Sequence, residues 1–183
     1  MGGKIKTAVE RLSENIRETP HFANAVFRVS TSMKGGDLKT NSEIRAFSIP
    51  MDEPRELGGD DTGPNPVEMV LAAFGSCQAI VYRAFATLLG IEIQEIDVHA
   101  KGHLDLRGFL NLAEVPAGFS GVTFTTRIVS SESTDNIRQL AVLVEKHCPV
   151  YDTLRQPVVV KGKVELVRPS AFGEGVEVVF ETA

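Results

Sequence analysis

The sequence contains only two cysteines, and they lie far apart in the chain. Cys77 and Cys148 form no Cys-x-x-Cys motif, and two thiols are too few for the disulfide framework of a small secreted domain. The wide spacing also disfavours a structural zinc site, whose Cys and His ligands are usually closer together. In an otherwise cysteine-free chain of intracellular character, such thiols are more often chemical than structural, so we interpret them as a dithiol redox couple.

The sequence also lacks a basic surface and a secretory signal. Its net charge of −5 and the lack of any cluster of basic and aromatic residues argue against binding to nucleic acid. Residues 1–17 hold six charged side chains and no apolar core, so they do not form a signal peptide and we expect a cytoplasmic protein. The most apolar stretch, 66–89, is interrupted by Glu68, Gln78 and Arg83, which favours a buried core helix over a membrane span.

The order of the expected elements is typical of an α+β protein. The sequence predicts helices at 8–19, 66–89 and 133–149, and strands at 25–30, 41–49, 91–101, 121–129, 157–167 and 176–181. Asn65 and Pro66 can begin the central helix, with Glu68 in the position of a capping box, and Gly90 can end it. A glycine-rich turn at 34–37 would join the first two strands. Helices and strands do not alternate regularly, which disfavours a doubly wound parallel sheet.

No linker, repeat or low-complexity tract divides the chain. At 183 residues it is long enough to bury one ordinary core, so we predict a single domain over 1–183. Residues 1–24 would form a helical extension before this domain, and residues 170–183 a tail after it.

The two cysteines stand in different local environments. Cys77 falls in the middle of the central helix, and its neighbours at helical spacing are apolar, so it needs a cation from another element or subunit to become reactive. Arg83 is a poor source, because six residues turn it about 120° away from Cys77 on the same helix. Cys148 is expected at a helix C-terminus, where the helix dipole disfavours a thiolate. This asymmetry suggests that Cys77 attacks and Cys148 resolves; the alternative is that both are inert buried cysteines.

Two separated motifs resemble those of a known family. The first runs from Asp52-Glu53-Pro54 through Gly58-Gly59-Asp60 and Gly63-Pro64-Asn65-Pro66-Val67-Glu68 to Cys77. The second is Glu145-Lys146-His147-Cys148-Pro149-Val150, and Gly90-Ile91-Glu92-Ile93 and Gly102-His103-Leu104-Asp105 lie between them. In this order they are similar to the signatures of the OsmC/Ohr superfamily, over about 25–167.

This resemblance implies an intertwined α+β homodimer with antiparallel sheets around two central cysteine-bearing helices and active sites at the subunit interface. It also implies a thiol peroxidase without metal or cofactor. Cys77 would attack an organic hydroperoxide, release an alcohol and become a sulfenic acid, which Cys148 would capture as a disulfide. A dithiol such as a lipoyl group would restore the two thiols.

Two positions depart from the peroxidase members of that family, which activate the thiolate with a glutamate ten residues before the first cysteine and an arginine in the early hairpin turn. Position 67 is valine here. Glu68 follows it and points about 100° away from position 67 around the helix, so the alternative role of Glu68 is the capping box. The turn at 33–37 has no arginine, which leaves Lys34, Arg28 or Arg45. We favour Arg45 as the cation beside Cys77; its alternative is a solvated strand charge.

Two other functions remain possible from the sequence. His99 and His103 could join His147 and Cys148 in a zinc site, although the spacing is wide. The chain could instead be a non-catalytic protein that binds a small hydrophobic ligand in an apolar pocket near Cys77 at a dimer interface. Val67 and the missing arginine favour this second alternative.

Overall fold

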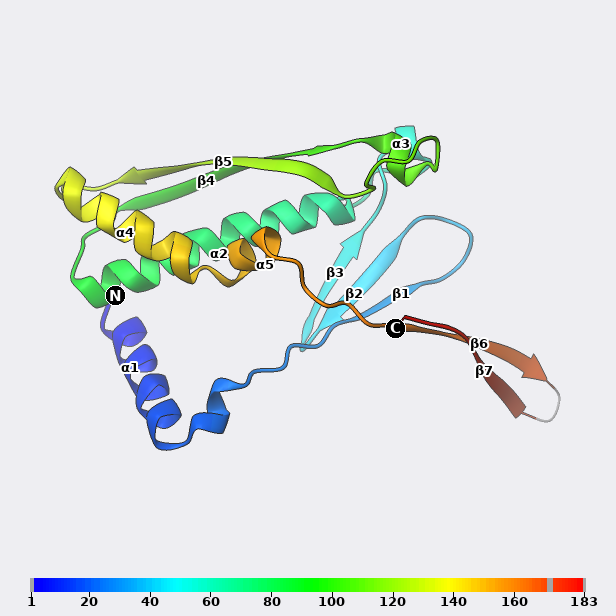
Figure 1. Ribbon diagram of the computed structural model, residues 1–183, viewed down its shortest axis with the longest axis horizontal. Coiled ribbons are helices and arrows are strands. Elements are labelled where there is room, and N and C mark those ends of the chain that lie inside the picture. Colours follow the sequence, from blue (N-terminus) through cyan, green and yellow to red (C-terminus); the bar gives the residue numbers. More distant parts are fainter. Residues whose placement is uncertain (1, 171–172, 183) are drawn as a thin grey trace. The chain divides into compact units, whose positions relative to one another are not determined.

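The computed structural model describes residues 2–170 and 173–182, in two compact units, Met1–Asp152 and Thr153–Ala183. The prediction of a single domain stays a prediction, and the units are described separately (Figure 1). The first unit contains, in order, α1 (Gly2–Glu18), the 3-10 turn η1 (Pro20–Ala23), β1 (Ser30–Met33), β2 (Thr40–Ile44), β3 (Phe47–Met51), η2 (Arg55–Leu57), α2 (Pro66–Leu89), β4 (Glu95–Leu104), α3 (Leu106–Phe109), β5 (Phe119–Val129), α4 (Thr134–His147) and most of α5 (Pro149–Arg155). The second unit contains β6 (Lys163–Ser170) and β7 (Gly173–Glu181).

The central helix α2 has the ends that its sequence predicts. The Asn65 side chain accepts from the Val67 N–H at 2.8 Å, and the Asn65 N–H donates to Glu68 Oε2 at 2.9 Å, which completes the capping box. Gly90 ends the helix in the left-handed conformation, at φ 71°. By length and composition α2 is the one helix among the described residues that could span a membrane, and 22% of its most apolar stretch is buried in the single chain.

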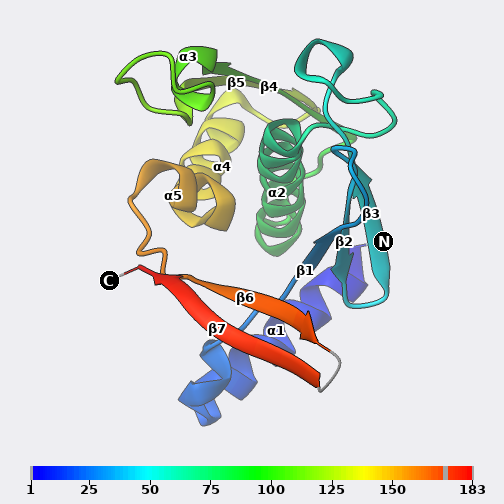
Figure 2. The same cartoon turned by 90° about the vertical axis from the view of Figure 1, so that its right-hand side faces the viewer.

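The core lies where α2 meets α4 and the β4–β5 hairpin. These two strands are antiparallel from Glu95↔Val129 to Leu104↔Phe119, and they extend across both helices (Figures 1 and 2). Tyr82 and Ala86 of α2 pack with Leu140 and Val144 of α4 and with Ile93 just before β4. The inward row of α2, at a spacing of four residues, holds the buried side chains Phe74, Gln78, Tyr82 and Ala86.

The N-terminal sheet differs from its sequence prediction. Strands β1, β2 and β3 form an antiparallel sheet in that order. The first strand begins at Ser30, and the expected strand at 41–49 is two strands joined by a turn at Arg45, whose φ is 56°. Apolar and polar residues alternate from Ile44 to Ala46 and again from Phe47 to Ile49, and the turn has none of the usual Asn or Gly, so the pattern did not reveal it. Arg45 is therefore a turn residue and not a strand residue.

The region after Cys148 also differs. We expected Pro149 to end the second helix, but a proline is well accommodated in the first turn of a helix, and α5 begins there. In the second unit β6 and β7 pair antiparallel from Lys163↔Glu181 to Ser170↔Gly173, so most of the expected tail is strand. Of the predicted tail, residues 171, 172 and 183 lie outside the described residues. The predicted N-terminal extension contains α1 and η1.

Candidate active site

The two cysteines meet between α2 and α4. The Cys148 Sγ donates a hydrogen bond to the Cys77 Sγ over 3.4 Å, and both thiols are free. Two ring pairs also join residues close in sequence to these cysteines. The ring centres of Phe74 and Tyr151 are 6.1 Å apart, and those of Phe85 and His147 are 5.4 Å apart. Because α2 and α4 run in opposite directions, cysteines that are 71 residues apart in sequence become neighbours. Cys77 lies within α2, whereas Cys148 lies between α4 and α5 and not within a helix.

The environments of the two thiols are unequal. Cys148 is fully buried and Cys77 is half-buried. Burial raises the pKa of Cys148; the backbone N–H groups of Tyr151 and Val150 oppose this increase, and the hydrogen bond to Cys77 adds to it. The N–H groups belong to the start of α5, an element that the sequence did not predict. Cys148 is thus the thiol that stays protonated, and its S–H group donates a hydrogen bond to the Cys77 sulfur.

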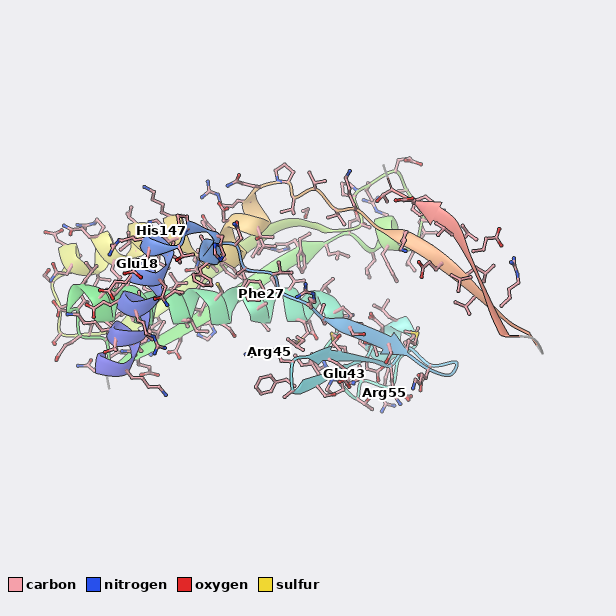
Figure 3. All side chains as sticks on the ribbon, turned by 90° about the horizontal axis from the view of Figure 1, so that it is seen from below. Glu18, Phe27, Glu43, Arg45, Arg55 and His147 are labelled. Atoms are coloured by element: carbon pink, nitrogen blue, oxygen red, sulfur yellow. The ribbon has the colours of Figure 1, made fainter. Side chains whose placement is uncertain are left out.

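The structure places Arg45 at the tip of the β2–β3 turn (Figure 3). Its side chain is exposed, and the guanidinium carbon lies 5.2 Å from the centre of the Phe47 ring. Among the described residues it is paired with Phe47 and with neither thiol. Arg28 and Lys34, the other cations that we considered, are exposed as well.

Glu68 has the capping role that was its alternative interpretation, because its carboxylate accepts from the Asn65 N–H. A role for Glu68 in activating Cys77 stays a prediction. A second acidic side chain reaches the same helix start, since the Asn65 amide donates to Glu53 Oε2.

Asp52 organises the loop before α2, a role that the sequence analysis missed. It is buried and accepts hydrogen bonds from the backbone N–H groups of Glu53, Asp60 and Thr62 and from the Thr62 hydroxyl. The Thr62 N–H is the main cause that lowers the pKa of Asp52, with the other donors adding to it and burial opposing it. The sequence signal for this role was an acidic residue directly after β3 and before a glycine-rich loop.

Gln78 is the second residue that the sequence analysis left without a role. Its side chain is fully buried, and neither its Nε2 nor its Oε1 has a hydrogen-bond partner among the described residues. The Thr126 hydroxyl on β5 is buried without a partner in the same way. A glutamine in an otherwise apolar row of α2 was the sequence signal.

The alternative zinc site is not assembled in the part of the chain that the structure describes. His99 and His103 lie on the exposed side of β4, and no group of three or more His, Cys, Asp and Glu side chains is placed to hold a metal ion there. An open groove of about 600 Å³ lies between α2 and β4. Its lining includes Leu71, Gly75 and Ser76 of α2 but neither cysteine.

An α+β fold with antiparallel sheets and a close thiol pair, with one thiol on the central helix and the other at the end of α4, places the chain among small cysteine-containing α+β proteins. The chain belongs to the OsmC-like protein family, whose sequence profile matches residues 58–163.

Several solved structures have the same fold. An OsmC-like protein from Mycoplasma pneumoniae is 18% identical, with a TM-score of 0.61 over 72% of this chain and 89% of the other. An organic hydroperoxide resistance protein OsmC from Legionella pneumophila is 21% identical, with a TM-score of 0.55 over 72% and 92%. An organic hydroperoxide resistance protein from Elizabethkingia anophelis is 18% identical, with a TM-score of 0.56 over 72% and 91%. No curated protein sequence matches the chain.

Proposed function

We propose that this protein is a cysteine-based peroxidase that reduces organic hydroperoxides to alcohols. The observation that carries the proposal is the contact of 3.4 Å between a half-buried Cys77 sulfur and a buried Cys148 sulfur. A sulfenic acid formed on Cys77 has its resolving thiol already within contact distance. The names of the similar structures from Legionella and Elizabethkingia, organic hydroperoxide resistance proteins, support the choice of substrate.

The roles of the two cysteines follow from their environments. The hydrogen bond that Cys148 donates stabilises a thiolate on Cys77, which is also the more accessible sulfur. The Cys77 thiolate attacks one peroxide oxygen, the O–O bond breaks, and the departing alkoxide takes a proton to become an alcohol. Cys148 then attacks the Cys77 sulfenic sulfur, the S–O bond breaks, and the oxygen leaves as water. A dithiol such as a lipoyl group reduces the resulting disulfide and is itself oxidised to a disulfide.

The proposal includes a cation and a second subunit. Arg45 is exposed on a turn, so its guanidinium can contact a Cys77 thiolate when another element or subunit packs against this turn.

Most of the apolar stretch of α2 is unburied in the single chain, and Ile80 and Leu89 are 67% and 56% exposed. A second copy of the chain would cover these side chains and form a homodimer. We place the protein in the cytoplasm, where thiols stay reduced between turnovers.

The test is the addition of one equivalent of cumene hydroperoxide to the reduced protein, followed by intact-mass and free-thiol analysis. The wild-type protein should lose two hydrogens and form an intramolecular Cys77–Cys148 disulfide. Cys148→Ser should gain one oxygen as a trapped sulfenic acid, and Cys77→Ser should be unchanged. Two unmodified thiols in the wild-type protein would contradict the peroxidase.

A non-catalytic binding protein is the second candidate. The open groove between α2 and β4 favours it, because a small apolar ligand could lie against Leu71 and Ala72 there. This candidate predicts a ligand that purifies with the protein, together with a Cys77 that does not react with hydroperoxide. Rapid alkylation of Cys77 at neutral pH would count against it.

A further inference from the structure

Gln78 lies at the level of the thiol pair and is enclosed within one subunit. On α2 it stands between Phe74, which contacts Tyr151, and Tyr82, which packs in one cluster with Val144. Cys148 lies between Val144 and Tyr151 in the chain, so Gln78 and Cys148 come to the same height along the two antiparallel helices. Because the Gln78 side chain has no exposed surface, its partner must come from within the same chain and not from a second copy.

The unpartnered state of Gln78 has a cost that needs a reason. A buried amide without hydrogen bonds destabilises a fold, and an apolar side chain of similar shape would avoid this cost. A buried polar group of this kind is typical of a residue that finds its partner in another state of the protein. The proposed reaction changes the charge of only one fully buried group here, the Cys148 sulfur, which must become a thiolate to attack.

We infer that Gln78 is a positioning residue for the resolving step, in which its Nε2–H group donates a hydrogen bond to the Cys148 thiolate. This inference rests on the proposed function. In the dithiol state Cys148 donates its own proton to Cys77 and needs no donor. Once Cys77 is a sulfenic acid, its sulfur no longer accepts this hydrogen bond. The Cys148 thiol then gives up its proton to the oxygen that leaves Cys77, and the amide stabilises the resulting thiolate. Its electron pair forms the S–S bond while the oxygen of Cys77 leaves with this proton as water.

No charged side chain among the described residues is placed to supply this donor. Cys77 is the reacting partner, and Tyr82, whose pKa is raised first by burial and then by Glu145, is a neutral phenol at physiological pH. Tyr151 contributes its backbone N–H, and His147 is exposed and lies against Phe85. The inward residues of the hairpin here are uncharged: Phe124, Thr126 and Ile128 on β5 and Ile96, Val98 and Ala100 on β4.

The test compares Gln78→Met, which removes the amide and keeps its length, with Thr126→Val, which removes the other unpartnered polar group of the same core. In a Cys77→Ser background, the ultraviolet absorbance of the thiolate is titrated to give the pKa of Cys148. Gln78→Met should raise this pKa by about one unit, and Thr126→Val should leave it unchanged. With Cys77 present, stopped-flow measurement should show sulfenic acid formation at the wild-type rate and disulfide formation slower by about tenfold at neutral pH, with recovery in alkali.

The outcomes separate this inference from the proposed function. An unchanged Cys148 pKa and disulfide rate in Gln78→Met, or equal changes in Thr126→Val, would overturn the role of Gln78 while the peroxidase stands. Failure of the wild-type protein to form any sulfenic acid would overturn the peroxidase instead, and the titration would still report on Gln78. A purely structural role predicts a less stable Gln78→Met, whereas we expect a melting temperature equal to or above that of wild type. If Gln78→Met does not fold, Gln78→Leu tests the same two readouts.

Discussion

Arg83 Nη1 donates a hydrogen bond to the backbone carbonyl of Ile93 at 2.6 Å and so joins α2 to the chain segment that leads into β4. The contact is partly buried, and Ile93 belongs to the core cluster of Tyr82 and Leu140. It also gives Arg83 a structural task, in agreement with the interpretation that this arginine does not serve Cys77.

Replacement of this arginine should cost stability and leave the thiol chemistry intact. We expect Arg83→Met to lower the free energy of unfolding by about 1.5–3 kcal/mol, because a charged donor is lost and the Ile93 carbonyl is left without it. Urea unfolding measures this change. Arg138→Met is the control, since its ion pair with Asp135 is on the surface and contributes little. A slower reaction of Cys77 in folded Arg83→Met would contradict the structural assignment.

Arg45 is the cation that we expect to activate Cys77, and its position on an exposed turn makes it separable from the fold. Arg45→Met should slow the reaction of Cys77 with cumene hydroperoxide by about tenfold at neutral pH, which corresponds to one unit of thiol pKa. Stability should change little, because the side chain is exposed and, among the described residues, stacks on Phe47.

The matched control for Arg45 is Arg55→Met, an exposed arginine in η2. It should react at the wild-type rate. Equal rates in Arg45→Met and the wild-type protein would remove Arg45 from the site, and the same measurement on Arg28→Met and Lys34→Met would then test the other two cations.

Much of the first unit could be predicted from residues that act locally. Asn65, Pro66, Glu68 and Gly90 define the ends of α2 because capping depends on neighbours within one helical turn. The contact between Cys77 and Cys148 could not be derived from spacing, since it depends on how α2 and α4 pack against each other. Their approach follows from tertiary structure, and the sequence suggested it only through the different environments of the two thiols and through family resemblance.

The errors have equally specific causes. Arg45 takes a left-handed conformation in a tight turn with no Gly or Asn, so alternation alone suggested one continuous strand. Pro149 was interpreted as a helix stop although proline also starts helices, and this hid the N–H groups beside Cys148. The isolation of Gln78 depends on what the elements packed against α2 place around it, which no local pattern contains.

Asp52 makes the loop before α2 sensitive to acid. Its folded-state pKa is lowered, so the stabilisation is present above the unfolded value of about 4 and is lost as pH falls through the lower folded value. Asp52→Asn should therefore be less stable than wild type at neutral pH, and its stability should fall less between neutral pH and about pH 3. Urea midpoints across this range measure both effects.

Asp61→Asn is the comparison for Asp52, because Asp61 is an exposed residue of the same loop. Its unfolding midpoint should follow that of wild type at every pH. If Asp52→Asn and the wild-type protein lose stability in parallel on acidification, another carboxyl group controls the acid transition.

Gly59 is required by a close approach of two backbone segments in this loop. A Cβ at position 59 would lie 1.8 Å from the Glu53 carbonyl oxygen, which is closer than any real contact, so the chain would have to move. The displacement would reach the start of α2, because Glu53 accepts from Asn65 and Asp52 holds Asp60. Gly59→Ala should lower the free energy of unfolding by about 1–3 kcal/mol.

Gly36→Ala distinguishes this close approach from a general effect of losing a glycine. Nothing lies within 4 Å of a Cβ at position 36, so the free energy of unfolding of Gly36→Ala should stay within about 0.5 kcal/mol of wild type. Thermal and urea unfolding of the two variants provide the comparison. Equal stability of both variants would mean that the loop accommodates a side chain at position 59 by moving as a whole, without disturbing the cap of α2.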